Sequence, residues 1–451
     1  MIGNDLTKGR VTQTLLRFTV PFLIANVLHT LYGIVDMYVV GQFADATQLS
    51  AVAISSGVMM LLNGLLMGFG TGGTVTVGQM YGSHREKDVK ETVSTIFCLF
   101  PLIAVILLVL GFIFLPLMLN LLNAPAESYD SAKAYLSICL IGLIFTGFFC
   151  GISAVLRGMG DSKGPTIFIS ISCVCNIVGD IFCVGVLKMG AAGAALATTI
   201  SQGISVGTGY IYLRRHNFPF DFRPKSFKIY KNKLGMLFRV GIPTALQETM
   251  TSISFLVLEA IINSMGYIAS ASAGVCDRVF NVSIMPAISF AAAISAMVAQ
   301  NTGAGEYKRA RKCLFSGSMI GVAVAAVIFA VMALFPAALI GCFTNDEAVI
   351  RSGVDYMTFY KFDCLLCSAA FCVNGYINGT GHTRYTMIVN LVASFAVRLP
   401  VVWFISRMAG AGLLQIGLGL PSASVIQLVV GLAFVFFAKS EREQKQKLAE
   451  P

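Results

Sequence analysis

Residues 15–21 read Leu-Leu-Arg-Phe-Thr-Val-Pro, and residues 237–243 read Leu-Phe-Arg-Val-Gly-Ile-Pro, a near copy 222 positions later. The correspondence continues at two distant landmarks. Gln79 of Val-Gly-Gln matches Gln300 of Val-Ala-Gln, and the Gly-Met-Gly at 158–160 matches the Gly-Thr-Gly at 379–381, both at an offset of 221. Because nearly the same offset serves several separate landmarks, we infer that the second half of the chain repeats the first.

Each half is predicted to cross a membrane six times. Of the 451 residues, 56% are hydrophobic and 12% are charged, and the mean hydropathy is +0.78, a balance that soluble proteins rarely show. A transmembrane helix needs about 20 mainly apolar residues. Twelve such spans are predicted, at 18–42, 50–80, 93–118, 133–156, 165–187, 190–213, 236–264, 270–300, 314–341, 354–378, 386–408 and 412–438.

The twelve spans predict an all-α polytopic membrane protein made of two six-helix bundles. Since six is an even number, the two copies keep the same orientation, and a pseudo-two-fold axis along the membrane normal should relate them. A central cleft is expected between them. The predicted division is an N-terminal lobe at 1–213, a basic connector at 214–235, a C-terminal lobe at 236–438 and a charged tail at 439–451.

The distribution of basic residues predicts the orientation. With the N-terminus in the cytoplasm, the outside loops carry only Lys133, Lys188, Arg351 and Arg407, whereas the inside segments carry 24 of the 32 Lys and Arg residues. Cytoplasmic loops are enriched in Lys and Arg, so both termini are predicted to be cytoplasmic and the first span to be an uncleaved helix of an inner membrane. The net charge of +10 then faces lipid headgroups and is weak evidence for nucleic-acid binding.

Other motifs argue against an enzyme or an ATP-driven pump. The glycines at 68–73 satisfy GxGxxG, but they follow an apolar helix and not a strand, so they are expected to allow close helix contact or a kink in the membrane. There is no GxxxxGK[ST] sequence and no soluble stretch large enough for a nucleotide-binding domain. The twelve cysteines lie mostly in apolar runs and are expected to pack inertly. None of the four histidines has metal-ligand spacing.

A cation site is predicted in the first half. Counting from the outer ends of their spans at about 1.5 Å per residue places Asp36, Asp180 and Thr198 at a common depth of about 10 Å. Asn176 lies one turn before Asp180 on the same face. Two carboxylates, an amide and a hydroxyl form an all-oxygen set, which suits Na⁺ or protons better than zinc or copper. The alternative is that these groups only satisfy one another between helices.

The second half lacks this acidic pair, because Val401 stands at the repeat position of Asp180 and Leu258 at that of Asp36. Inside spans, six acids face three bases, and ionisable groups there are costly unless they serve a function. Besides the two aspartates the acids are Glu248, Glu259, Asp277 and Asp363, and the bases are Arg278, Lys361 and Arg398. For Asp277, Arg278, Lys361 and Asp363, which lie close in sequence to opposite charges, the simpler interpretation is internal pairing or a span boundary drawn too wide.

Several stretches resemble the multidrug and toxic compound extrusion (MATE) family over essentially the whole chain. Residues 31–36, Leu-Tyr-Gly-Ile-Val-Asp, look like its first-helix signature, and residues 176–180, Asn-Ile-Val-Gly-Asp, with the Ala-rich stretch up to Thr198 look like its helix 5–6 signature. Met-Pro-Ala at 285–287 and Gln-Asn-Thr-Gly-Ala-Gly at 300–305 are also similar. The DinF-like and related prokaryotic branch matches best.

The resemblance implies a monomeric exporter, without a cofactor, that exchanges amphipathic organic cations for inward Na⁺ or H⁺ by alternating access of its two lobes. In that branch the N-lobe cation site falls on Asp36, Asn176, Asp180 and Thr198. NorM-type members place coupling acids in the second lobe, so a second ion site stays open. By analogy we assign to the substrate cleft Tyr32, Glu248, Glu259, Asp277 and Asp363.

Two other functions predict different sequence patterns. A flippase of lipid-linked precursors is expected to have a strongly cationic cleft and usually more than twelve spans. A membrane-embedded enzyme needs a His, Ser or metal constellation at membrane depth, which His29 alone does not supply. Neither pattern is present in the sequence.

Overall fold

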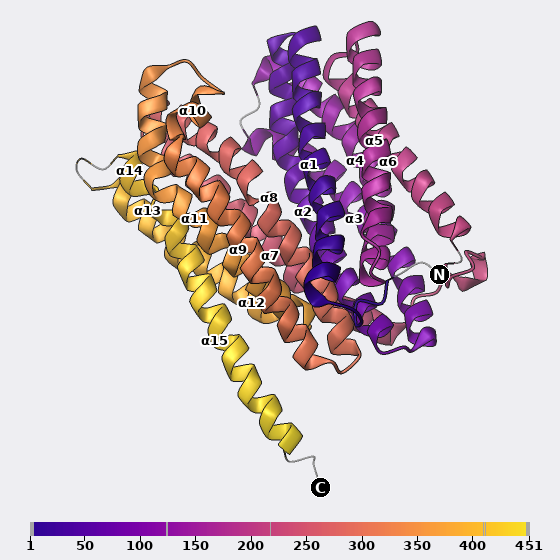
Figure 1. Ribbon diagram of the computed structural model, residues 1–451. Helices are drawn as coiled ribbons and strands as arrows, with labels where there is room; N and C mark the ends of the chain where they lie inside the picture. The colour runs from indigo at the N-terminus through magenta and orange to yellow at the C-terminus, as the bar shows by residue number, and fades with distance from the viewer. Residues whose placement is uncertain (1–3, 123–124, 217, 409, 411, 448–451) are drawn as a thin grey trace. The chain divides into compact units, whose positions relative to one another are not determined.

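The computed structural model describes residues 4–122, 125–216, 218–408, 410 and 412–447, and within these ranges it contains helices and no strand. The first six long helical segments are α1 (Val11–Phe43), α2 (Ala46–Gly82), α3 (Glu86–Leu121), α4 (Ala126–Gly158), α5 (Lys163–Asp180) continued by the π-helix η1 (Ile181–Val186), and α6 (Gly190–Arg215) (Figure 1). They correspond to the first six predicted spans.

The next six segments follow the short 3₁₀ turn η2 (Pro224–Ser226). They are α7 (Lys231–Asn263), α8 (Tyr267–Gly303), α9 (Tyr307–Leu334), α11 (Glu347–Gly379), the run of α12 (Thr383–Leu391), π-helix η3 (Val392–Arg398) and α13 (Leu399–Ser406), and α15 (Gly419–Lys447). Two short helices, α10 (Pro336–Gly341) and α14 (Leu413–Ile416), precede α11 and α15.

Eleven of the twelve segments are long and apolar enough to span a membrane, counted over the described residues. The exception is α6, whose 26 residues include many glycine, serine and threonine residues that lower its hydropathy. The prediction of one span at 314–341 is wrong at its end. The helix α9 stops at Leu334, and Pro336, which lacks a backbone N–H, begins the separate helix α10.

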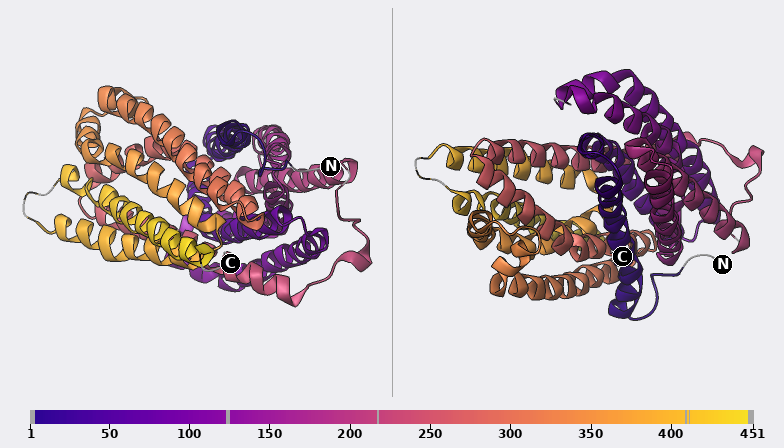
Figure 2. Two further views of the ribbon diagram at one scale, coloured as in Figure 1. Left: turned by 60° about the horizontal axis from the view of Figure 1, so that its bottom comes forward. Right: turned by 90° about the horizontal axis from the view of Figure 1, so that it is seen from above.

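The chain divides into two compact units. The first comprises residues 1–9, 16–245 and 299–306, and the second comprises residues 10–15, 246–298 and 307–451. In the first unit α4 packs against α2, α3 and α6, and α5 packs against α6. In the second unit α11 packs against α9 and α15, and Figure 2 shows α11 and α15 running alongside each other.

The glycines at 68–73 allow close helix contact, as predicted. In the first unit a Cβ atom on Gly68 would overlap the backbone of Ala245, and one on Gly72 would lie 2.6 Å from the Cα atom of Gly241. The hydroxyl of Thr244 donates a 2.7 Å hydrogen bond to the carbonyl of Gly68. The start of α7 therefore packs on α2 at backbone distance, as small residues allow in membrane helices.

A reciprocal contact lies at the ends of α2 and α8, also in the first unit. A Cβ atom on Gly82 would overlap the backbone of Gln300, and a Cβ atom on Gly303 would overlap the backbone of Gln79. The two pairs are related by the repeat offset of 221. Each half thus contributes one glycine and one glutamine, and the glycine of each half contacts the glutamine of the other half.

The N-terminal segment is fixed at the same place. The backbone N–H of Leu6, which is buried, donates to Oε1 of Gln300 at 3.0 Å, and Nδ2 of Asn301 donates to the Leu6 carbonyl at 3.3 Å. Nε2 of Gln300 in turn donates to the carbonyl of Gly158 at 2.8 Å. Buried amide side chains therefore hold a segment of turns and bends that precedes the first helix.

The predicted connector at 214–235 packs onto α3 of the first unit. The Phe97 ring lies 5.7 Å from that of Phe220 and 5.8 Å from that of Phe222, measured between centroids. The buried ammonium group of Lys233 lies 2.5 Å from Oδ1 of Asp88. Aromatic packing and an ion pair thus fix a segment that the sequence alone presents as a basic loop.

Candidate functional site

Asp36 and Thr198 meet inside the first unit. Asp36 lies in the second half of α1 and is 5% exposed, and Thr198 lies in the third turn of α6. The Thr198 hydroxyl donates to Oδ2 of Asp36 at 3.2 Å. The contact joins residues 162 positions apart, and it agrees with the depth that was counted from the ends of the spans.

Asp180 and Asn176 lie beside Asp36 on α5, and both are fully buried. Among the described residues, neither carboxylate oxygen of Asp180, neither polar atom of the Asn176 side chain, nor Oδ1 of Asp36 has a hydrogen-bond partner of normal geometry. Buried polar atoms are rarely left in this condition, because desolvation without a partner is costly. The set suits a cation or a proton that bridges the two carboxylates.

The helix changes its winding directly after Asp180. The π-helix η1 begins at Ile181, and the backbone N–H of Leu187 donates to the carbonyl of Phe182, five residues back, at 2.9 Å. A π turn adds a residue to the turn and is found frequently at functional sites. The apolar sequence 181–186 gives no sign of this change, so sequence reasoning missed it.

Tyr32 and Ser201 extend the site toward the start of α1. The Tyr32 and Ser201 hydroxyl oxygens are 3.2 Å apart, and the Ser201 hydroxyl donates to the carbonyl of Thr198 at 2.8 Å. Sequence reasoning placed Tyr32 in the substrate cleft and did not select Ser201. Its position one turn after Thr198 was an available signal, because residues three apart share a helix face.

The four acids predicted in the second half lie in the second unit and fall into two groups. Glu248 and Glu259 are exposed on α7. Asp277 on α8 is half-buried and accepts a 2.9 Å hydrogen bond from the Tyr360 hydroxyl. Asp363 on α11 is buried and accepts a 2.5 Å hydrogen bond from the Ser424 hydroxyl. Asp277 and Asp363 thus have internal partners, but these are the neutral hydroxyl groups of Tyr360 and Ser424.

A buried cation, Arg398, lies near Asp363. Arg398 is 5% exposed, its guanidinium carbon is 4.4 Å from the centroid of the Phe255 ring, and its Nη1 donates a long 3.5 Å hydrogen bond to Ser254 Oγ. Arg398 and Asp363 interact electrostatically, although no ion pair within 4 Å joins them in the described structure. The second unit therefore contains a buried acid and a buried cation that interact without forming a direct ion pair.

The described residues contain no group of three or more His, Cys, Asp or Glu side chains that could hold a metal ion. The cysteines in this part of the chain are all free thiols. A transition-metal site needs several such ligands together. The oxygen set around Asp36 and Asp180 therefore remains as the candidate ion site.

A family model described as MatE matches the chain twice, over residues 21–182 and 243–404. This chain belongs to the MATE family. The two matches are offset by 222 residues at both ends and begin at Pro21 and Pro243, so the model confirms the duplication. As a member of this family of multidrug efflux transporters, the protein is a multi-pass membrane transporter and not an enzyme.

Individual relatives align with this MATE transporter along nearly its whole length. It is 26% identical to the probable multidrug resistance protein YoeA of Bacillus subtilis, over 98% of this chain and 97% of that protein. It is 27% identical to the probable multidrug resistance protein NorM of Thermotoga maritima, over 98% of this chain and 96% of that protein.

Solved structures share the fold. An outward-facing multidrug resistance MATE family transporter of the MOP superfamily matches with a TM-score of 0.92 and 19% identity, over 98% of this chain and 99% of that one. A MATE in complex with MaL6 matches with a TM-score of 0.90 and 19% identity, over 99% of this chain and all of that one. The predicted MATE fold of twelve helices is thereby confirmed.

Proposed function

We propose that this MATE transporter exports amphipathic organic cations in exchange for Na⁺ or H⁺ that enters the cell, by alternating access of two six-helix lobes. Its relatives YoeA and NorM are named probable multidrug resistance proteins, which supports small organic molecules as the substrates. The lobes are those predicted at 1–213 and 236–438. Both termini are proposed to be cytoplasmic, the membrane to be the inner membrane, and the transporter to work as a monomer.

The observation that supports ion coupling is the buried pair Asp36 and Asp180. Two carboxylates that approach each other in a buried site cannot both stay charged without a counter-charge. The hydroxyl of Thr198 supplies one hydrogen bond, and the amide of Asn176 lies adjacent. A bound proton or Na⁺ supplies the missing charge, and its release leaves a strained, doubly anionic state. The ion therefore changes the energy of the site substantially.

Such a site can drive alternating access only if its affinity differs between the two conformations of the transporter. A ligand shifts a conformational equilibrium by its differential affinity for the two states. The hydrogen bond from α6 to α1 is sensitive to helix displacement, because Thr198 and Asp36 sit on different helices. Movement of α1 against α6 would change the ion's ligands and couple binding to the transport cycle.

Acidic residues support a preference for cationic substrates. Glu248 and Glu259 are exposed on α7 and lie eleven residues apart, which is close to three helical turns of about 3.6 residues. They therefore occupy nearly the same face of the helix. We propose that this face of α7 attracts cationic substrates. By analogy with the family we propose that the half-buried Tyr32 and Asp277 and the buried Asp363 also contribute to substrate binding.

A transport assay tests the function directly. The purified protein is reconstituted into proteoliposomes, and the movement of ethidium is followed after a Na⁺ gradient or a H⁺ gradient is imposed separately. One of the two gradients should drive ethidium against its concentration, and collapse of that gradient should stop it. No gradient-driven movement of any member of a panel of lipophilic cations would contradict the proposal.

A further inference from the structure

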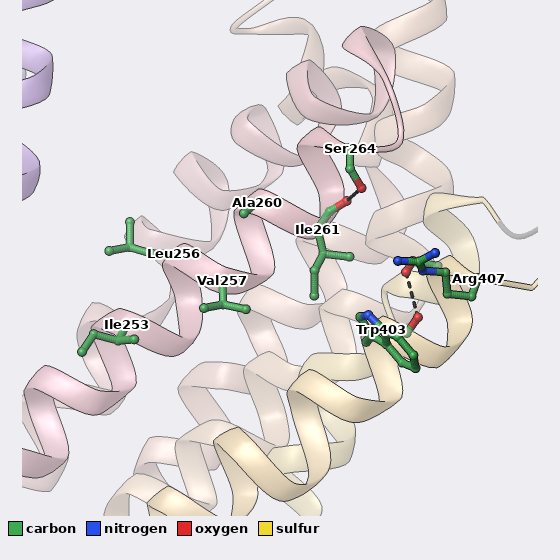
Figure 3. Close-up of a pocket in the computed structure, with 9 residues that line it drawn as sticks. Ile253, Leu256, Val257, Ala260, Ile261, Ser264, Trp403 and Arg407 are labelled. Atoms are coloured by element: carbon green, nitrogen blue, oxygen red, sulfur yellow. Dashed lines mark hydrogen bonds between the residues drawn. The ribbon is translucent and has the colours of Figure 1, made fainter. Parts of the chain in front are cut away.

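A groove on the surface of the second unit is not used by the proposed transport mechanism. It has a volume of about 420 Å³ and runs along one face of α7, with α13 on its other side (Figure 3). The α7 side is lined by Ile253, Leu256, Val257, Ala260, Ile261 and Ser264. The α13 side is lined by Trp403, Ser406 and Arg407.

The polarity of the groove changes along its length. The part from Ile253 to Ile261 is entirely apolar, whereas its end carries the hydroxyls of Ser264 and Ser406 and the guanidinium of Arg407. The guanidinium carbon of Arg407 lies 5.4 Å from the centroid of the Trp403 ring. In Figure 3 the Arg407 side chain extends over Trp403 at this polar end. Tryptophan and arginine mark the depth at which the hydrocarbon core gives way to lipid headgroups.

The groove face of α7 is distinct from the acidic face of that helix. At about 100° per residue, the groove residues centre about 140° around the helix axis from Glu248 and Glu259. Leu258 and Ile262, which are buried in the core, lie on the remaining side. The helix thus has three faces: one packs into the core of its own unit, one carries the acids, and one is apolar and exposed. Leu256, on the third face, is 46% exposed.

We propose that this groove binds an anionic glycerophospholipid, with the phosphate at Arg407 and an acyl chain along Ile253 to Ile261. The guanidinium matches a phosphate, because arginine binds phosphate oxygens through several N–H donors. The hydroxyls of Ser264 and Ser406 already donate to the carbonyls of Ile261 and Trp403, so Arg407 is the group that binds the phosphate. The apolar stretch matches hydrocarbon. The charge of Arg407 disfavours the lipophilic cations proposed as substrates, so the groove selects a different ligand. This inference is independent of the proposed transport activity.

The groove contains its own reporter, because Trp403 is the only tryptophan in the chain. The protein is reconstituted in vesicles in which a phospholipid with brominated acyl chains, which quench tryptophan fluorescence on contact, has either a phosphatidylglycerol or a phosphatidylcholine headgroup. We expect brominated phosphatidylglycerol to quench Trp403 with about five-fold higher apparent affinity than brominated phosphatidylcholine. The reason is that the attraction of one basic side chain to anionic headgroups contributes about 1 kcal/mol to the binding free energy. Arg407→Gln should remove this preference.

Matched variants separate specific binding from other effects. Arg351→Gln removes an exposed arginine of α11 and should leave the headgroup preference unchanged. Ala260→Phe fills the apolar part of the groove and should reduce quenching by both lipids. Equal quenching by the two headgroups in the unmodified protein, or a preference that persists in Arg407→Gln, would overturn the proposal. So would relief of the quenching by added tetraphenylphosphonium, which would identify a site for cationic substrates.

Discussion

Arg398 and Ser254, which are joined by a 3.5 Å hydrogen bond in the second unit, stand 222 positions after Asn176 and Tyr32 of the first unit. The second half therefore has a fixed guanidinium at the position where the first half has a neutral amide beside two carboxylates. The counterpart of Asp36 at the same offset is Leu258, which is buried. At an offset of 222 the second half thus has a buried guanidinium and a buried leucine where the first half has an amide and a carboxylate.

The electrostatic interaction between Arg398 and Asp363 predicts that Arg398 stabilises the charged form of Asp363. Arg398→Met should lower the free energy of unfolding by about 1–2 kcal/mol, because it removes the favourable long-range interaction between the guanidinium and the buried carboxylate. Asp363→Asn added to Arg398→Met should restore part of the loss, with a coupling energy of about 1 kcal/mol or more. Thermal unfolding of the four proteins in detergent measures the cycle. Additive effects of the two substitutions would contradict electrostatic coupling.

Neutralising either aspartate of the first unit should abolish gradient-driven transport. Asp36→Asn and Asp180→Asn keep the shape of the side chain but cannot exchange a proton or balance Na⁺. Folding and membrane insertion should persist, since removal of a buried charge lowers the cost of burial. The measurement is ethidium transport in proteoliposomes, together with substrate binding, which should survive.

Controls for this prediction use the repeat positions of the second half. Leu258→Asn and Val401→Asn introduce a polar group where the sequence repeat has apolar residues. They should not reproduce a selective loss of coupling with binding retained. If both aspartate variants transport at the unmodified rate, the assignment of the ion site to the first unit is wrong.

The hydroxyl of Thr198 should contribute to the affinity for the coupling ion. Thr198→Val removes the hydrogen bond to Asp36 with little change in volume, and a hydrogen bond to a charged group is worth about 1.5–3 kcal/mol. The ion concentration for half-maximal transport should rise about ten-fold or more. Thr198→Ser retains the hydroxyl and should stay near the unmodified value. Equal losses in the two variants would indicate a packing role.

Two glycines of one helix should respond differently to the same substitution. Gly68→Ala places a methyl group against the backbone of Ala245 and should lower the free energy of unfolding by about 1–3 kcal/mol. Gly70→Ala is the matched control, because nothing lies within 4 Å of a Cβ atom there, and alanine favours the helix. Thermal unfolding should show a lower midpoint for the first variant only.

The positions of the helices could be predicted because each span is a long apolar run, and the depth of Asp36, Asp180 and Thr198 followed from counting residues. The break between α9 and α10 was missed although Pro336 marks it, because the apolar run continues through it. The π-helix after Asp180 has no sequence mark at all. Which hydroxyl faces Tyr32 depends on how α1 and α6 pack, and periodicity within one helix cannot supply that.

Arg398 shows a different limit. At an offset of 221 the counterpart of Asn176 is Val397, and at 222 it is Arg398, so a difference of one residue decides whether a charge stands at the equivalent site. Landmarks in the chain support both offsets, and the two family matches are separated by 222. A buried cation near Asp363 is visible only in the folded structure, because Asp363 lies on α11 and Arg398 lies at the end of η3.

The reciprocal contact of Gly82 with Gln300 and Gly303 with Gln79 has the form of an isologous interface, in which residue i of one copy meets residue j of the other and j meets i. Such a contact is what a two-fold symmetric dimer of identical six-helix chains would make. It would have been available to an ancestor before its gene was duplicated and fused. The first unit still incorporates residues 299–306 from the second half, so two separately expressed halves would each lack a piece and would have to regain it by association.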